Sequence, residues 1–296
     1  MSERRVWYLN FDAEEELARA GAVTPSRAMR ARCAELVGRV ARLWREGDRV
    51  VTPGDALTRA EGAWRGMAWC PTPGAARVLK AAGASVGEVP SWGVLRAVNH
   101  RAFSAKLGQW LPGAAYVRDE SELRAALAAR SCSGAWLFKK PLGYSGRGRL
   151  RMRGDEPDAH SWRWLRAALA EGDGLQVEPA VERVADYGLH GYVARDGGVT
   201  WGALTVQRCD ANGQWLETVR ARDGALEADA RRKLDVVGER VVAALCAAGY
   251  WGPFGIDAFA WRDGGDVVCF NALCEVNARY SMGWAVGMGD ARPDLG

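Results

Sequence analysis

The sequence predicts an α/β fold, in part α+β, with a small N-terminal lobe followed by a larger domain of two subdomains. Three observations lead to this prediction. Strands and helices alternate over about the first 95 residues, a glycine-rich turn joins two basic strands near the middle of the chain, and two apolar strands near its end carry isolated polar residues. At 296 residues the chain is also long for one compact core.

The N-terminal lobe is expected to cover residues 1–95 and to be a small open sheet. Its expected elements are strands at 6–9 and 49–51 and helices at 12–20, 27–44 and 73–82. Asp12 can cap the first helix, and the second has apolar residues at helical spacing with arginines opposite. In such a sheet the loops that follow the strands are available to a ligand. Nothing in the lobe specifies that ligand.

The second domain is expected to cover residues 96–296, with a division into 96–175 and 176–296. Its expected helices lie at 94–111, 121–129, 161–171 and 227–248. Its expected strands lie at 116–117, 135–138, 149–153, 175–181, 250–261 and 267–275, with a hairpin formed by 187–194 and 199–207. The chain has no internal repeat and no low-complexity linker, so we expect the subdomains to be packed together.

Composition and charge exclude several classes of protein. Hydrophobic residues make up 48% of the chain and charged residues 26%, as in an ordinary globular protein. A net charge of +4 is too small to favour a nucleic acid or a membrane as partner. The seven cysteines form no Cys-x-x-Cys pair and are expected to be reduced. The start, MSERRVWYLNFDAEEE, lacks the apolar run of a signal peptide and no stretch could span a bilayer, so we expect a cytoplasmic protein.

The most informative stretch is AWLFKKPLGYSGRGRLRMR, at 135–153. A strand ends in Lys139 and Lys140, and Pro141 favours an extended backbone before it. The glycines of the following turn let backbone amides approach an anion, and a lysine beside them can hold phosphate oxygens. Because successive strand residues point to opposite faces, only one of the two lysines can face the ligand. Lys139 shares its face with Leu137.

The glycine-rich turn belongs to neither of two common nucleotide-binding loops. No Gly-Lys-Ser/Thr opens a helix here, so it is not a P-loop, and the strand that follows argues against a Rossmann fingerprint. The candidate ligand contacts in the turn are Gly143, Ser145, Gly146, Arg147 and Gly148. The three arginines of the next strand alternate on one face, which fits a solvated sheet surface as well as a phosphate clamp, so of the local arginines only Arg147 is taken as a candidate contact.

A candidate metal site lies in the last two strands. Asp257 stands within the apolar run FGIDAFAW, where an ionised carboxylate needs a partner such as a cation or an arginine. Glu275 and Asn277 are two residues apart on one strand face and offer the oxygen ligands that Mg²⁺ prefers. Arg279 continues the same alternation. We therefore expect Asp257, Glu275 and Asn277 to hold one or two Mg²⁺ ions, with Mn²⁺ as an alternative.

Taken in order, these features resemble the ATP-grasp superfamily: a strand lysine before a glycine-rich loop, a glutamate at a strand end, an Asp in an apolar strand, and a final Glu-x-Asn-x-Arg. The resemblance covers about residues 99–283 and implies two subdomains that clasp ATP. Counting back from Gly146-Arg147-Gly148 in the family's usual register favours Lys139 over Lys140 as the phosphate ligand. Arg101 lies where the family carries a lysine that reaches the phosphates, and arginine can also pair with phosphate.

The resemblance also implies where the nucleoside would lie. Glu178 matches the hinge between the two subdomains, where adenine contacts the backbone of the following residues, here Ala180 and Val181. Asp186 falls where the family often keeps a carboxylate for the ribose hydroxyls, and Glu182 is the competing candidate. A carboxylate suits this task because its two oxygens can accept from two vicinal hydroxyls.

The resemblance implies an ATP-dependent, ADP-forming ligase. Such an enzyme phosphorylates a carboxylate, small or peptide, to an acylphosphate, which an amine or another nucleophile then attacks. Lys139, Arg279 and Mg²⁺ would neutralise the transferred phosphoryl group. A kinase with a stable phosphorylated product and an inactive nucleotide-binding module are the alternatives. The substrates are not specified by the sequence, and a homodimer is compatible with it.

Overall fold

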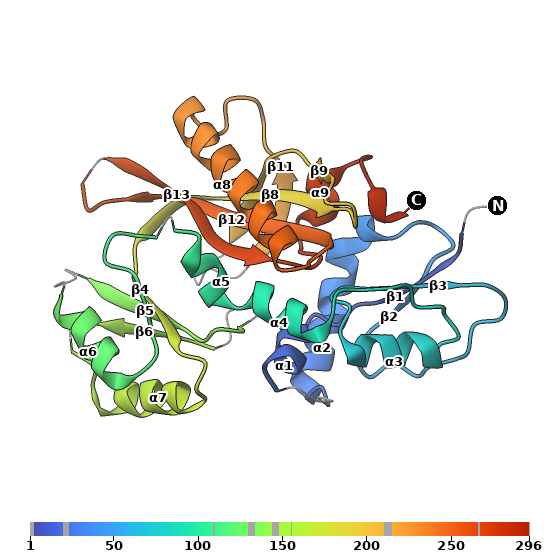
Figure 1. Ribbon diagram of the computed structural model, residues 1–296, viewed down its shortest axis with the longest axis horizontal. Helices are drawn as coiled ribbons and strands as arrows, with labels where there is room; N and C mark the ends of the chain where they lie inside the picture. The colour runs from blue at the N-terminus through green and yellow to red at the C-terminus, as the bar shows by residue number, and fades with distance from the viewer. Residues whose placement is uncertain are drawn as a thin grey trace.

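The computed structural model describes residues 3–19, 24–108, 110–129, 134–143, 148–154, 156–209, 215–265 and 267–295. Three sheets organise these residues: a three-stranded sheet at the start of the chain, a four-stranded sheet in the middle and a six-stranded sheet towards the end. Figure 1 shows the first and second sheets lying apart, joined by two consecutive helices, with the six-stranded sheet across both. The predicted mixed α/β architecture is confirmed.

The N-terminal lobe is a parallel sheet in the order β2-β1-β3, formed by Arg5–Tyr8 (β1), Arg49–Val51 (β2) and Arg65–Ala68 (β3). Its helices are α1 (Ala13–Arg19), α2 (Arg27–Val37), the 3-10 helix η1 (Gly38–Leu43) and α3 (Pro73–Ala81). Strand β3 was not expected. The single helix expected over 27–44 is wrong, because Val40 has non-helical backbone angles (φ −114°, ψ 20°) just after Gly38, a poor helix former.

The four-stranded sheet has the order β4-β7-β5-β6. Its strands are Ala115–Val117 (β4), Ala135–Lys139 (β5), Arg149–Arg153 (β6) and Leu175–Pro179 (β7), and its helices are α6 (Glu120–Ala128) and α7 (Ala159–Ala170). Trp136 and Phe138 are fully buried and pack with Leu123 of α6 and Leu165 of α7. Because strand residues alternate, Leu137 and Lys139 face away from these helices.

The six-stranded sheet is antiparallel, in the order β11-β10-β8-β12-β13, with β9 paired to β8. Its strands are β8 (Glu182–Val193), β9 (Val199–Trp201), β10 (Thr205–Cys209), β11 (Trp215–Arg220), β12 (Gly252–Arg262) and β13 (Val268–Asn277). The single strand expected over 199–207 is therefore divided into β9 and β10, and strand β11 was not expected. The expected helix over 227–248 is present as α8 (Ala228–Ala247).

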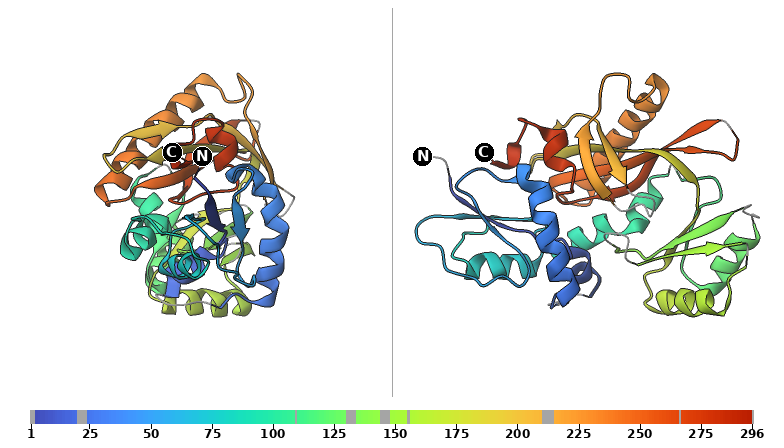
Figure 2. Two further views of the ribbon diagram at one scale, coloured as in Figure 1. Left: turned by 90° about the vertical axis from the view of Figure 1, so that its right-hand side faces the viewer. Right: turned by 180° about the vertical axis from the view of Figure 1, so that it is seen from behind.

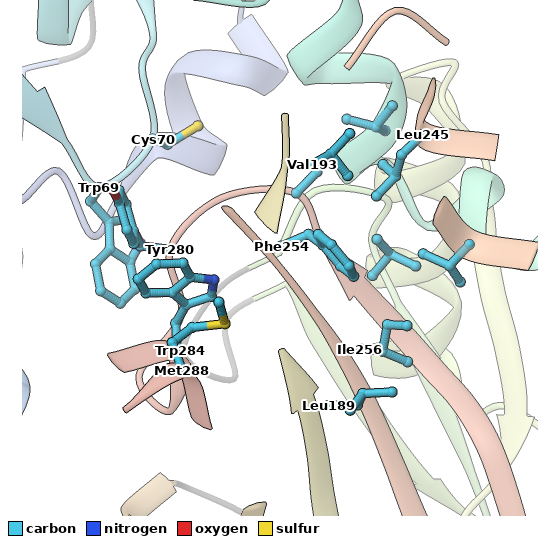
Figure 3. Packing of buried hydrophobic residues seen from close by; sticks show 14 of the residues in the cluster. Trp69, Cys70, Leu189, Val193, Leu245, Phe254, Ile256, Tyr280, Trp284 and Met288 are labelled. Atoms are coloured by element: carbon cyan, nitrogen blue, oxygen red, sulfur yellow. The ribbon is translucent and has the colours of Figure 1, made fainter. Parts of the chain in front are cut away.

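Helix α8 covers one face of the six-stranded sheet. Figure 3 shows Val193 of β8 next to Leu245 of α8, with Phe254 and Ile256 of β12 and Leu189 of β8 following along the sheet, and all five belong to one buried core. The opposite face therefore carries the alternate residues of these strands. Part of that face is covered by α9 (Trp284–Met288), which precedes the 3-10 helix η2 (Pro293–Leu295).

His190 of β8 lies under α9 in a space that four glycines leave open. A Cβ atom built on Gly188, Gly255, Gly283 or Gly287 would come within 3.0 Å of the His190 ring. The ring is 1% exposed and lies 3.2 Å from Thr205 Oγ1 through Nε2 and 3.4 Å from Ser281 Oγ through Nδ1. Burial lowers its pKa to about 4, so the histidine is neutral at pH 7.

Two consecutive helices, α4 (Trp92–Asn99) and α5 (Arg101–Lys106), connect the lobe to the rest of the chain (Figure 1). The single helix expected over 94–111 is wrong, since His100 has extended backbone angles (φ −75°, ψ 134°) and its Nδ1 caps α5 by accepting from Ala102 N–H. Both helices are attached to β13 and the residue after it. Asn99 exchanges two hydrogen bonds with the backbone of Ala278, and Ser104 Oγ accepts from Val276 N–H at 3.0 Å.

Helices α4 and α5 lie below the six-stranded sheet and between the other two sheets (Figure 1). The view from behind in Figure 2 shows β8 running from the four-stranded sheet up into the six-stranded one. The domain boundaries at 95 and 175 stay predictions, and the pairing of β7 with β4 and β5 favours counting residues 175–179 with the four-stranded sheet. No helix in the described part of the chain is long and apolar enough to cross a membrane.

Candidate functional site

A large cavity lies between the four-stranded and six-stranded sheets. Its volume is about 1300 Å³, and its walls come from β5, β6 and β7 on one side and from β8, β10, β12 and β13 on the other. Seven cationic and four acidic side chains are among its described lining residues. Such an excess of positive charge favours a polyanionic ligand.

Lys139 lines the cavity, whereas Lys140 does not belong to its described walls. Lys139 is 7% exposed, and its Nζ forms an ion pair with Glu178 of β7, which also accepts from Gln176 Nε2 at 2.9 Å. The Lys140 ammonium instead pairs with the exposed Glu171, beyond the C-terminal end of α7. The strand alternation thus separates the two lysines as the sequence predicts; which of them contacts a nucleotide stays a prediction.

Arg101 begins α5 and reaches two parts of the cavity wall. Its guanidinium forms an ion pair with Glu275 (Nη1 to Oε2, 3.1 Å) and donates from Nε to the carbonyl of Lys140 at 3.1 Å. Of the predicted loop contacts, Gly143 and Gly148 line the cavity. The other three, Ser145, Gly146 and Arg147, lie outside the described residues. Gly148 has a φ of +70°, which favours glycine at this position.

Two arginines of β6 also face the cavity. Arg149 pairs with Lys139 across the strands and Arg151 with Leu137, so both share the face of the cavity-lining residues of β5. Their strand face is thus part of the cavity wall, which adds to the positive charge around Lys139. From the sequence alone, this face fitted a solvated sheet surface as well as a phosphate clamp.

The predicted hinge residues gather at one end of the cavity. Glu178, Ala180, Val181 and Asp186 all line it, and the Ala180 N–H donates to the carbonyl of Ala135 at 2.7 Å. Glu182 is instead paired with Arg262, at 3.5 Å, and is not among the described lining residues. Between the two carboxylates considered for a ribose, Asp186 is therefore the one that faces the cavity.

Arg183 contacts both Asp186 at this end of the cavity and Phe259 in the wall formed by β12. Its Nη1 donates to Asp186 Oδ1 at 2.6 Å, and its guanidinium carbon lies 4.0 Å above the ring of Phe259. A register shift in the pairing of β8 with β12 leaves Val184 as an extra residue, which brings Arg183 to the side of Asp186. Arg183 and Phe259 both line the cavity.

Asp257, Glu275 and Asn277 lie together on the cavity face of β12 and β13. Asp257 is directly opposite Glu275 in the antiparallel pair, and Asn277 Nδ2 donates to Asp257 Oδ2 at 2.9 Å. Gln207 of β10 donates to the other oxygen of Asp257, also at 2.9 Å. Burial, and then the charge of Glu275, raises the pKa of Asp257 to about 6.

The donor set fits a cation that prefers oxygen. Two neighbouring carboxylates and an amide meet the usual requirement of Mg²⁺ for one or two protein carboxylates, with substrate phosphates completing its shell. It is a sparse set, since no group of three or more His, Cys, Asp or Glu that could hold a metal occurs among the described residues. The bound cation itself stays a prediction.

Arg279 lines the cavity at the side of the N-terminal lobe. Its Nε donates to Glu14 Oε1 of α1 at 2.7 Å, its Nη2 donates to the same oxygen, and its Nη1 donates to the carbonyl of Tyr280 at 3.0 Å. The guanidinium carbon lies 5.9 Å from the ring centre of Trp69, at the end of β3. The N-terminal lobe thus contacts a predicted catalytic residue directly.

No family model matches the sequence, and a search of curated proteins finds no significant relative. The fold, however, matches solved structures over nearly all of the chain. The biotin carboxylase domain of 2-oxoglutarate carboxylase from Hydrogenobacter thermophilus, solved with MgADP and bicarbonate, aligns with a TM-score of 0.55 and 16% identity over 95% of this chain and 65% of that one.

Two further structures give the same result. D-alanyl-alanine synthetase A from Vibrio cholerae aligns with a TM-score of 0.52 and 12% identity, over 94% of this chain and 89% of that one. N5-carboxyaminoimidazole ribonucleotide synthetase from Thermus thermophilus aligns with a TM-score of 0.51 and 20% identity, over 93% and 71%. The chain has the ATP-grasp fold. At these identities the likeness establishes the fold and not the reaction.

Sequence reasoning missed three residues of this ATP-grasp cavity and its surroundings. Gln207 alternates with Thr205 on a short strand, a pattern that could have indicated an inward polar side chain. Glu14 is one of three consecutive glutamates, which read as an ordinary acidic first turn of a helix. Arg183 could not be identified from the sequence, because its orientation depends on the register shift between β8 and β12, which no sequence pattern indicates.

Proposed function

We propose that the protein is an ATP-dependent, ADP-forming ligase that activates a carboxylate as an acylphosphate and joins it to an amine or another nucleophile. The observation that carries the proposal is the convergence of Lys139, Arg101, Arg279 and the Asp257–Glu275 pair on one cationic cavity of an ATP-grasp fold. The three cationic side chains would neutralise a transferred phosphoryl group, which is the main task of a phosphoryl-transfer site, and the two carboxylates would hold the Mg²⁺ that assists them.

The size of the cavity supports a reaction of two or more substrates. About 1300 Å³ exceeds the roughly 300–1,000 Å³ of a typical site for one small ligand. A nucleotide held between Ala180, Asp186 and Lys139 would leave the end beside Arg279 for the carboxylate. The biotin carboxylase domain of 2-oxoglutarate carboxylase was solved with both MgADP and bicarbonate, which is consistent with a cavity for two ligands.

In the proposed reaction the residues of this chain bind, orient and neutralise. Lys139 leaves Glu178 to contact phosphate oxygens, and Arg101 contacts them beside Glu275. Asp257, Glu275 and Asn277 would hold Mg²⁺, which supplies charge neutralisation at the phosphates. A carboxylate oxygen attacks the γ-phosphorus and ADP leaves; the nucleophile then attacks the acyl carbon and inorganic phosphate leaves. Arg279 faces both phosphate and acyl oxygens with its planar donor group.

Two experiments test the proposal in sequence. ADP release from MgATP is first screened against paired libraries of carboxylates and amines, and we expect release only when both substrates of a matching pair are present. The carboxylate is then labelled with ¹⁸O, and one label should appear in the released phosphate. Unlabelled phosphate would refute an acylphosphate, and ADP formed with a stable phosphorylated carboxylate would identify a kinase instead. A chain that binds MgATP but releases no ADP with any pair of substrates would be an inactive nucleotide-binding module, and a chain that binds no MgATP would refute the proposal.

A further inference from the structure

The contact between Arg279 and Glu14 crosses from one lobe of the protein to another. Arg279 follows β13, whereas Glu14 lies in the first turn of α1, 265 residues earlier. The side chains are 12% and 4% exposed, so the pair is largely removed from water. Both hydrogen bonds to Glu14 end on Oε1. The other oxygen, Oε2, is buried and has no hydrogen-bond partner among the residues that the structure describes.

The parts of the lobe that hold Glu14 are themselves fixed. Ala13 and Leu17 of α1 are buried in the main core, and Phe11 packs against Trp69 with ring centres 4.7 Å apart. The loops after β1 and β3 are tied together by two hydrogen bonds between Asn10 and the backbone of Cys70. The chain around Arg279 is joined to the same frame, because Tyr280 N–H donates to the carbonyl of Trp69 at 3.1 Å.

The hydrogen bonds leave one end of the guanidinium group for a ligand. Of its five N–H groups, the one on Nε and one on each terminal nitrogen are used by Glu14 and Tyr280. For the remaining two, no acceptor is found in the part of the chain that the structure describes. Arg279 lines the cavity and Glu14 does not belong to its described walls. Glu14 therefore binds the Arg279 guanidinium on the side away from the cavity.

We propose that Glu14 is a positioning residue, through which the N-terminal lobe sets the orientation of Arg279 towards the transferred phosphoryl group. This inference rests on the proposed function. A carboxylate suits the role for two reasons: it compensates a guanidinium that stays charged when buried, and it fixes one edge of that planar group. Without Glu14 the guanidinium would keep its charge but lose its direction, and a displacement of about 1 Å can cost roughly 100-fold in a reaction.

The test uses MgADP with aluminium fluoride, which mimics the phosphoryl group in transfer and needs no knowledge of the acceptor. We expect Glu14→Ala to weaken binding of this complex by roughly 100-fold, while affinity for MgADP alone changes less than about twofold. Glu14→Gln keeps an acceptor at the same reach and should fall between Glu14→Ala and the wild type. If Glu14→Ala does not fold, the affinities of Glu14→Gln provide the test instead.

A double-mutant cycle separates positioning from a general structural role. If Glu14 acts through Arg279, then adding Glu14→Ala to Arg279→Ala should weaken binding of the aluminium fluoride complex no further. Asp173→Asn is the matched control: it disrupts another pair of arginine and carboxylate, Arg96–Asp173, whose arginine also lies over a tryptophan, Trp92, away from the cavity. It should leave both affinities unchanged.

Results that overturn the role of Glu14 differ from results that refute the proposed function. Losses that multiply in the double variant, or an equal loss for MgADP and for its aluminium fluoride complex, would overturn the positioning role and leave the proposed function standing. Failure of the wild-type chain to bind MgADP at all would refute the proposed function and this role with it.

Discussion

Replacing Lys139 perturbs the protein in two ways that can be measured separately. In Lys139→Ala the carboxylate of Glu178, whose side chain is 7% exposed, loses its cation and keeps Gln176 as a neutral donor. Removing one partner of a buried ion pair costs about 3–5 kcal/mol of unfolding free energy. Lys140→Ala breaks a pair whose carboxylate, Glu171, is 56% exposed, so its cost should stay below about 1 kcal/mol. Urea denaturation of both variants measures the difference.

Nucleotide affinity gives the second measurement. A hydrogen bond to a charged group contributes about 1.5–3 kcal/mol, so Lys139→Ala should weaken binding of a non-hydrolysable ATP analogue with Mg²⁺ by roughly 10- to 150-fold in a calorimetric titration. Lys140→Ala should change it little, because its ammonium lies outside the described cavity wall. In the double variant with Glu178→Gln, stability should recover because no unpaired buried charge remains, while the lost contact with the phosphates persists.

Two results would refute this reasoning. Equal affinities for the wild type and Lys139→Ala would show that Lys139 does not contact the phosphates. An affinity that recovers fully together with stability in the double variant would show that the single variant lost binding only through the unpaired charge of Glu178.

Three further predictions concern the reaction, the metal and acid stability. Arg279→Lys keeps the charge but loses the fork, so kcat should fall about 100-fold with ATP affinity nearly unchanged; an unchanged kcat in steady-state assays would remove Arg279 from the mechanism. Glu275→Gln should abolish turnover and the Mg²⁺ dependence of analogue binding, and turnover near the wild-type rate would show that Glu275 is not a ligand. For His190 the folded-state pKa of about 4 lies below the ordinary 6.5, so protons bind the unfolded chain preferentially between these values. Stability should therefore fall by roughly 1.4 kcal/mol per pH unit as pH drops from 6.5 to 4, and His190→Gln, denatured by urea over the same range, should lack this part of the slope.

Much of the fold could be predicted because its long elements have a clear periodicity. Helix α8 and the strands β5, β6, β12 and β13 follow the pattern of apolar residues closely. The same alternation correctly separated Lys139 from Lys140 with respect to the cavity, and brought Glu275 and Asn277 to one face. The face on which a strand residue lies depends only on its position within that strand, so it can be predicted from the sequence.

What the sequence could not supply depends on tertiary structure. The break between α4 and α5 at His100 comes from a side-chain cap, and strand β3 is too short and too polar at Arg65 to stand out. The pairing of Arg279 with Glu14 joins residues 265 positions apart, and no periodicity reports such a contact. The partner of Arg101 likewise depends on how α5 docks on β13.

The glycines around His190 have a consequence for how the sequence can change. A Cβ at Gly188, Gly255, Gly283 or Gly287 would approach the imidazole to 3.0 Å or less, and at Gly188 and Gly283 it would also meet the side chains of Thr205 and Thr218, so His190 alone sets the limit only at Gly287. An alanine at 287 would therefore require a smaller residue at 190. Homologues should therefore vary positions 190 and 287 together or not at all, and a library that randomises both should recover folded chains that a single substitution at 287 never reaches.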